Sequence, residues 1–370
     1  MGQGEIRFEQ MLQLLPEGWE SKAKELGALQ RAREIKSPEE LLRLILLYLT
    51  EGKSFAGTSA ITQLSGEAAL NKMAVYKRFR NSAAWLQWLC EHIYRRAGLT
   101  ITKPAWLQNR NVILMDGTED VKCGVRRQCY MLHYSLDLFT LAARELLVTD
   151  RKTGEKLTNF KRIGKGDIVM GDRAYGTPQG IAYVRQRKAD YVLRIKSCGF
   201  TVFDGKNRET DLLLRLSRLK EGKIADINVK CVINGREEPI RICALRKDRE
   251  SERKGIKRLT KENQRKQGGK PVSDLQRENN KYIIIATSLG AEVTAAQILE
   301  LYRARWQIEL AFKRLKSLFH YNDLPANQSD SVRSWFYGKL LLAALCETLV
   351  NTGRFSPCGE TFPHIRFAAT

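Results

Sequence analysis

The chain of 370 residues is long enough for two or three domains built around a large core. Its 63 Lys and Arg residues exceed its 41 Asp and Glu residues, and the resulting net charge of +22 predicts a polyanionic partner, nucleic acid before anionic membrane. The longest apolar run, over 340–346, is far shorter than the ~20 residues of a membrane span, and no leader pattern begins the chain, so membrane insertion and secretion are not expected.

The first part of the chain, residues 1–104, predicts an all-α region. Ser37 and Pro38 are typical of a helix start. Two shorter helices, separated by a Ser-Gly break, are expected over 59–64 and 72–89, in the outline of a helix-turn-helix. Basic residues at the front of the second helix predict DNA contacts: Lys72, Lys77, Arg78 and Arg80. The alternative is an ordinary helical bundle with a solvated basic face, but the net charge favours DNA.

From about residue 105 the pattern changes from helices to strands. Short apolar runs predict strands over 111–115, 129–138, 144–149, 168–170, 191–195, 201–203, 227–232, 240–245 and 281–287. A helix is expected over 178–188. Residues 246–281 hold many Lys and Arg and little apolar material, so they are expected to form an exposed basic arm or loop.

Two aspartates each follow a buried strand-like run. Asp116 comes directly after the run over 111–115, and Asp172 follows the run over 168–170 after one glycine. Carboxylates held at strand ends by a rigid sheet are well placed to bind Mg²⁺ through oxygen. The alternatives are a simple Asp-Gly turn for Asp116 and a local salt bridge with Arg173 for Asp172. Three nearby acids that do not directly end an apolar run are kept in reserve: Glu119, Asp120 and Asp167.

A third candidate carboxylate lies on an amphipathic stretch predicted to be one helix over 301–316. At about 100° of rotation per residue, four functional side chains share a stripe roughly 60° wide beside an apolar face. These are Tyr302, Arg305, Glu309 and Lys316. The alternative is a surface helix on which Arg305 and Glu309 form an i,i+4 ion pair. Trp306, on the same helix, is expected to be a core residue.

Asp116, Asp172 and Glu309 converging on one point would repel each other unless a cation joined them. Two divalent ions about 4 Å apart would relieve that repulsion and clamp the attacking and leaving oxygens of a phosphoryl displacement. Arg305 and Lys316 would hold DNA phosphates. Zinc is not expected, because the eight cysteines form no C-x-x-C pair and the four histidines complete no zinc set.

The spacing of Tyr302, Arg305, Glu309 and Lys316, with two, three and six residues between them, resembles the Y-R-E-K signature of bacterial insertion-sequence transposases of the insertion-sequence-four group. These are DDE enzymes, and Asp116 in Met-Asp-Gly-Thr and Asp172 in Gly-Asp-Arg-Ala-Tyr-Gly are similar to their two catalytic aspartates. The resemblance runs from about residue 35 to about residue 350.

The resemblance implies an α/β fold with a ribonuclease-H-like core, a β-rich insertion and an all-α N-terminal DNA-binding region. It places the core at 105–199 and 282–350, the insertion with its basic arm at 200–281, and an unassigned tail at 351–370. It also implies Mg²⁺ or Mn²⁺ as cofactor, double-stranded DNA as partner, a homodimer in the synaptic complex, cut-and-paste transposition through a hairpin, and a bacterial cytoplasmic, nucleoid-associated location.

On the family's pattern, Asp116, Asp172 and Glu309 are the catalytic metal ligands, and Tyr302, Arg305 and Lys316 contact DNA near the cleaved end. The family's C-terminal segment often begins like Arg354-Phe355, and here the chain stops soon after, at Thr370. The alternative function is therefore a catalytically impaired derivative that binds DNA as a repressor or inhibitor.

Overall fold

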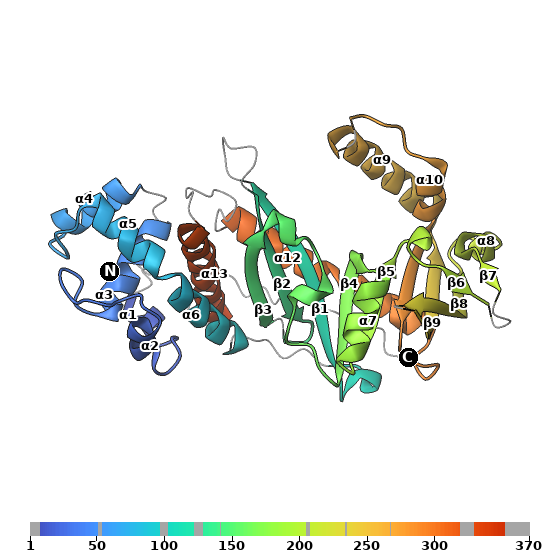
Figure 1. Cartoon of the computed structure of the whole chain (residues 1–370), viewed down its shortest axis with the longest axis horizontal. Helices are drawn as coiled ribbons and strands as arrows, with labels where there is room; N and C mark the ends of the chain where they lie inside the picture. Colours follow the sequence, from blue (N-terminus) through green and yellow to red (C-terminus); the bar gives the residue numbers. More distant parts are fainter. Residues whose placement is uncertain are drawn as a thin grey trace.

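The computed structural model describes residues 8–50, 54–96, 103–121, 129–140, 142–204, 208–233, 235–266, 268–318 and 329–351. Helices occupy one end of the molecule, a large mixed sheet the middle, and a small helical pair projects near the other end (Figure 1). The tail over 352–370, left unassigned from the sequence, lies outside the described residues. No helix in the described ranges has the length and apolar character needed to cross a membrane.

The N-terminal part is a group of helices: α1 (Phe8–Leu12), α2 (Trp19–Glu25), α3 (Pro38–Thr50), α4 (Phe55–Leu64), α5 (Lys72–Asn81) and α6 (Ala83–Arg96). The predicted helix start at Pro38 is confirmed, since the Ser37 hydroxyl accepts a hydrogen bond from the Glu40 N–H. The single helix expected over 72–89 is wrong. It is divided at Ser82, whose hydroxyl donates to the Arg78 carbonyl 2.8 Å away and so competes with the helical pattern.

The C-terminal helix α13 (Ser329–Asn351) joins these helices to the sheet. It packs against α3, α5 and α6 and also contacts α12, and α6 itself contacts β3 (Figure 1). The buried Lys339 donates to the Leu49 carbonyl at 2.8 Å, and Arg333 donates to Gln87 at 3.0 Å. The N-terminal helices therefore share a core with the sheet.

Ten strands form one sheet in the order β3-β2-β1-β4-β5-β10-β9-β8-β6-β7. Their bounds are β1 (Asn111–Val121), β2 (Cys129–Asp137), β3 (Ala143–Asp150), β4 (Asp167–Gly176), β5 (Asp190–Ile195), β6 (Val202–Phe203), β7 (Glu209–Thr210), β8 (Ile224–Ile233), β9 (Arg236–Arg246) and β10 (Tyr282–Thr287). The pairs β1–β4 and β4–β5 are parallel and all others are antiparallel. The strands expected from apolar runs are thus all present.

The parallel strands β1, β4 and β5 are buried on both faces. Along β1, Val112 and Leu114 point into the core shared with α13, whereas Ile113 and Met115 point into a second core on the opposite face. The second core is covered by α7 (Pro178–Gln186), which was expected over 178–188, and by α8 (Leu212–Leu216). Short 3₁₀ turns complete this part: η1 (Ala105–Leu107), η2 (Arg151–Thr153), η3 (Leu157–Asn159) and η4 (Ser197–Gly199).

The basic stretch over 246–281, predicted to be an exposed arm or loop, is largely helical. It contains α9 (Arg249–Lys266) and α10 (Asp274–Asn280), which stand away from the sheet (Figure 1). As the low apolar content of this stretch predicts, α9 exposes most of its residues. Hydrogen bonds to α10 hold α9: the Asn280 amide donates to the Glu252 carbonyl at 2.8 Å.

The single helix predicted over 301–316 is also wrong. The chain forms α11 (Ala295–Arg303) and α12 (Trp306–Leu318), separated by Ala304 and Arg305. At the break the backbone N–H groups donate three residues back, from Arg305 to Tyr302 and from Ile308 to Arg305, in the tighter pattern of a 3₁₀ turn.

Candidate active site

Asp116 lies inside β1 and does not end the strand as the sequence suggested. It pairs with Tyr134 across the antiparallel side, whereas the parallel pairing with β4 ends one residue earlier, at Met115 and Gly171. Its carboxylate accepts the Gly117 N–H at 2.8 Å, and its side chain is only 16% exposed. The strand therefore holds this carboxylate in a fixed, mostly buried position.

Asp172 lies beside it on the neighbouring strand. It follows Gly171 inside β4, where the pairing with β5 is interrupted between Gly171 and Gly176. Its carboxylate accepts the Ala174 N–H at 2.8 Å. Burial raises the pKa of Asp116 to about 7, and the charges of Asp172 and Glu155 add to this effect, while the Gly117 N–H and Arg305 oppose it. The structure thus brings the two predicted aspartates together.

Arg305 connects this pair to Glu309 on α12. One guanidinium nitrogen of Arg305 lies 3.7 Å from a carboxylate oxygen of Asp116, and the other donates to the Glu309 carboxylate. The i,i+4 ion pair that the sequence offered as an alternative is therefore present, but Arg305 is only 17% exposed and faces the sheet as well. The side chain of Glu309 is 57% exposed and bound to Arg305 instead of to the aspartates.

Within the described ranges no three side chains of metal-ligating type converge closely enough to hold an ion. The donor set nevertheless fits a hard divalent cation, since it consists of carboxylate oxygens and Asp116 lies in a concentration of negative charge. Glu309 would have to leave Arg305 to complete such a site. The ordinary i,i+4 ion pair that holds it is weak enough for a divalent ion to displace.

The other residues of the predicted stripe lie close to this group to different degrees. Tyr302, at the end of α11, is buried, and the Arg305 guanidinium lies 5.9 Å from the centre of its ring. Lys316 is partly buried on α12, about two turns beyond Glu309. Trp306 was expected in the core, but its side chain is 44% exposed, because the break before α12 turns it outward.

Two further residues at the aspartates were missed from the sequence. The Glu155 carboxylate lies against Gly117, 2.8 Å from the position that a Cβ would occupy there. Tyr175 is buried, and its hydroxyl has no hydrogen-bond partner in the described part of the chain. Burial, and then the charges of Asp116, Glu155 and Asp172, raise the pKa of Tyr175. Tyr175 could have been predicted to lie near the site, because it follows Asp172 by only three residues. Glu155 follows a turn, and nothing in its sequence context predicts its position near the aspartates.

Two of the three reserve acids are paired with arginines away from the site. Asp167 is bound to Arg144 at 2.7 Å, and Glu119 lies 3.1 Å from Arg151. The side chain of Asp120 lies outside the described residues.

The predicted DNA contacts on α5 are also remote from the aspartates, because α13 lies between α5 and the sheet (Figure 1). Lys72 and Lys77 are exposed, and Arg78 and Arg80 are partly buried. Arg78 donates weakly to the Arg31 carbonyl at 3.4 Å. They form a separate basic surface.

Comparison with known proteins gives one matching family, the transposase DDE domain, over residues 108–345. The chain is 32% identical over 344 residues to InsL, named for insertion sequence element IS186A of Escherichia coli strain K12, and the match covers 91% of each chain. It is 32% identical over 345 residues to the transposase for insertion sequence element IS421 of Escherichia coli, again over 91% of each chain. A shorter match, 26% over 199 residues, covers 50% of this chain and 41% of the transposase for IS231E of Bacillus thuringiensis subsp. finitimus.

Proposed function

Because the chain belongs to the family of transposases with a DDE domain, we propose that Asp116, Asp172 and Glu309 are the three catalytic carboxylates of an insertion-sequence transposase. The enzyme cleaves DNA at transposon ends and transfers the freed strand to a target. The observation that carries this assignment is the bridge from Arg305 to both Asp116 and Glu309, which ties α12 to β1, the strand next to the one that bears Asp172. The insertion-sequence-four group is the proposed subfamily.

The catalytic core is ribonuclease-H-like in this proposal. The strand order β3-β2-β1-β4-β5, in which β1, β4 and β5 are parallel and β2 is antiparallel to both of its neighbours, supports it. The aspartates on β1 and β4 occupy the two central strands of this unit. The β-rich insertion then contributes β6 to β9, which continue the same sheet.

Asp116, Asp172 and Glu309 would hold Mg²⁺ or Mn²⁺. When bound, the ions would lower the pKa of the attacking water or 3′-hydroxyl and neutralise charge on the leaving oxygen. Asp116 and Asp172 are fixed by their hydrogen bonds to backbone N–H groups, whereas Glu309 would have to give up its ion pair with Arg305 to join them. The released Arg305 guanidinium would then be available to a DNA phosphate.

DNA near the cleaved end would be held by Tyr302, Arg305 and Lys316, and duplex DNA further along by the N-terminal helices through Lys72, Lys77, Arg78 and Arg80. Two copies of the chain act together, because two transposon ends must be cut in one complex. The second strand is cut through a hairpin formed by the freed 3′-hydroxyl, and the reaction takes place on nucleoid DNA in the bacterial cytoplasm. The net charge of +22 supports a DNA partner throughout.

The test is cleavage of DNA that carries the element's terminal inverted repeats, with Mg²⁺ present. The variants Asp116→Ala, Asp172→Ala and Glu309→Gln are each expected to abolish end cleavage while leaving end binding largely intact, and Asp190→Asn is the matched control at a surface ion pair. Full cleavage by any of the three catalytic variants would overturn the site assignment.

A further inference from the structure

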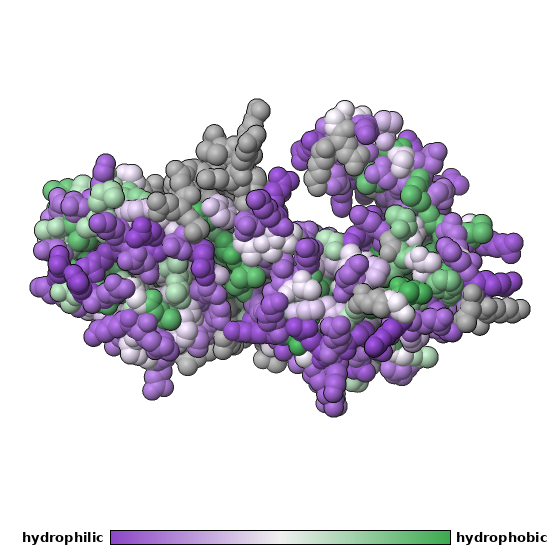
Figure 2. Space-filling model, viewed as in Figure 1, coloured by the Kyte–Doolittle hydropathy of each residue, from purple (hydrophilic) through white to green (hydrophobic). Residues whose placement is uncertain are grey.

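A groove of about 870 Å³ lies between the helical pair α9–α10 and the ends of β9 and β10. Seven cationic side chains and three carboxylates line it, together with a few uncharged residues. Figure 2 shows this helical pair overhanging the body of the molecule, with a hydrophilic surface around the hollow. The groove is separate from the aspartates of the active site.

The charge in this groove is not balanced. Each of the three carboxylates is paired with one cation, in the pairs Arg246–Glu252, Arg249–Glu221 and Lys281–Glu278. Seven cations less these three leave four, which have no carboxylate within ion-pair distance in the described part of the chain: Lys247, Arg253, Lys257 and Arg277. A groove with this excess suits a polyanion.

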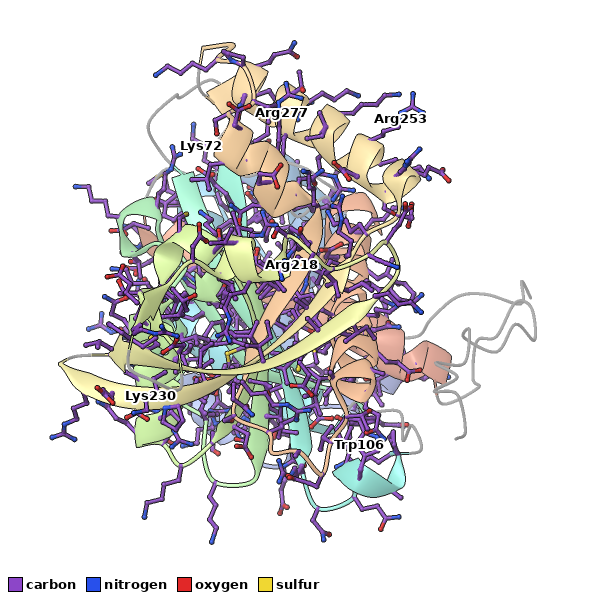
Figure 3. The ribbon with its side chains drawn as sticks, turned by 90° about the vertical axis from the view of Figure 1, so that its right-hand side faces the viewer. Lys72, Trp106, Arg218, Lys230, Arg253 and Arg277 are labelled. Carbon is purple, nitrogen blue, oxygen red and sulfur yellow. The ribbon has the colours of Figure 1, made fainter. Side chains whose placement is uncertain are left out.

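Arg253 and Lys257 lie one helical turn apart on α9, and both are exposed. Like charges at this spacing repel each other, so an anion between them would be favoured. Arg277, on α10, donates through Nε to the Val272 carbonyl at 3.3 Å. Figure 3 shows Arg253 and Arg277 on the two helices at the same end of the molecule.

Lys247 extends this positive surface toward the active site. Its ammonium donates to the Asn280 side chain at 3.1 Å and is half-buried. Burial lowers the pKa of Lys247 to about 8, and the charges of Arg194 and Arg173 lower it further, whereas Glu252 raises it. Arg173 follows Asp172 directly in the sequence, so the cations run from the groove to the second catalytic aspartate.

We propose that the groove between α9, α10 and the end of β9 binds the phosphates of a DNA strand whose reacting phosphodiester lies at Asp116 and Asp172. This inference rests on the proposed function, since it takes DNA as the substrate. The strand belongs either to the transposon end or to the flanking DNA beyond the cleavage point, because both present the same phosphate backbone.

The test is the salt dependence of DNA binding, measured by fluorescence anisotropy in the full chain without divalent metal. The double variant Arg253→Ala/Lys257→Ala removes two groove cations from exposed positions. The matched control Lys254→Ala/Lys261→Ala removes two exposed cations from the same helix that do not line the groove. Each phosphate contact contributes about −0.9 to the slope of log K against log salt, so the groove variant should lose about 2 from the slope and the control close to none.

Two duplexes separate the sources of the phosphates. One ends at the tip of the inverted repeat, and the other continues by about one helical turn (~10 bp) of flanking DNA. A slope change on both duplexes assigns the groove to the transposon end, and a change only on the longer duplex assigns it to flanking DNA. Equal slopes for the groove variant and the control on both duplexes would overturn the inference.

A failure of the proposed function can be distinguished from a failure of the groove assignment. A wild-type chain that cleaves no end DNA would remove the catalytic assignment, yet the same two variants on an unrelated duplex would still report whether the groove holds phosphates. Wild-type cleavage with unchanged slopes in the groove variant would remove only the groove.

Discussion

Replacing Asp116 by Asn should stabilise the metal-free protein at neutral pH. Asp116 is mostly buried between Asp172 and Glu155, and its pKa rises from the ordinary value of 3.8 to about 7. A folded-state pKa raised above the unfolded value means that the unfolded chain loses its proton first as pH rises. This carboxyl group therefore costs no stability below about pH 4, an increasing amount between pH 4 and 7, and a constant amount above.

The size of the effect follows from that difference. A tenfold change in an equilibrium constant is about 1.4 kcal/mol, so a rise from 3.8 to about 7 corresponds to about 4 kcal/mol above pH 7. That difference already contains the attraction of Arg305 and the hydrogen bond from the Gly117 N–H, both of which lower the pKa of Asp116. Asn keeps an acceptor for the Gly117 N–H, so the expected gain is about 4 kcal/mol, or roughly 5 °C in Tm for 370 residues.

The assay is thermal unfolding in EDTA at pH 5 and at pH 8 for the wild type, Asp116→Asn and the control Asp190→Asn. We expect the gain in Tm for Asp116→Asn to be larger at pH 8 than at pH 5, and the control to lose up to about 1 kcal/mol of ion-pair energy with no gain. A Tm for Asp116→Asn that is equal to or below that of the wild type at pH 8 would refute the claim that the ionised Asp116 carboxylate destabilises the folded protein.

Three other outcomes follow from the geometry. Arg305→Ala should reduce end cleavage about 100-fold or more, measured in Mg²⁺ with end DNA, because the guanidinium joins α12 to β1 and is proposed to hold a phosphate; near-normal cleavage would contradict this. Gly176→Ala should destabilise the fold by about 1–3 kcal/mol in chemical denaturation, because a Cβ there would lie 1.9 Å from the Arg194 carbonyl oxygen, whereas the control Gly164→Ala has open space and should be near neutral. Arg241→Met should cost about 1–3 kcal/mol in the same experiment, because it leaves the buried carbonyls of the loop before α11 without their donor, whereas Asp226 on β8 is exposed enough to be hydrated; an unchanged unfolding curve would show that these contacts are not structural.

The strands of the sheet could be predicted because buried strands appear as short apolar runs, such as the one over 111–115. The strand's continuation from Asp116 to Val121 could not, because no apolar residue occurs there before Val121 and the segment is held by pairing with β2. The position of Asp116 next to Asp172 also depends on β1 and β4 being neighbours, which is a property of the sheet order.

The sequence correctly predicted that Glu309 lies on a helix, but it predicted one helix over 301–316 where the structure has two. No Gly or Pro marks the break at Ala304 and Arg305, and the 3₁₀ turn there follows from packing, since both Tyr302 and Ala304 are buried. The same break exposes Trp306, which the sequence placed in the core. Glu155 could not be found at all, because its contact with Gly117 joins a loop to a strand 38 residues away in sequence.

The most direct test of the three-carboxylate site maps the metal itself. Fe²⁺ replaces Mg²⁺ in the protein bound to end DNA, and hydroxyl radicals generated with ascorbate and peroxide cut the polypeptide close to the ion. We expect breaks clustered near Asp116, Asp172 and Glu309, and their suppression by excess Mg²⁺. Breaks near only the two aspartates, or none of these positions, would show that Glu309 stays with Arg305 and that the three carboxylates do not form one metal site.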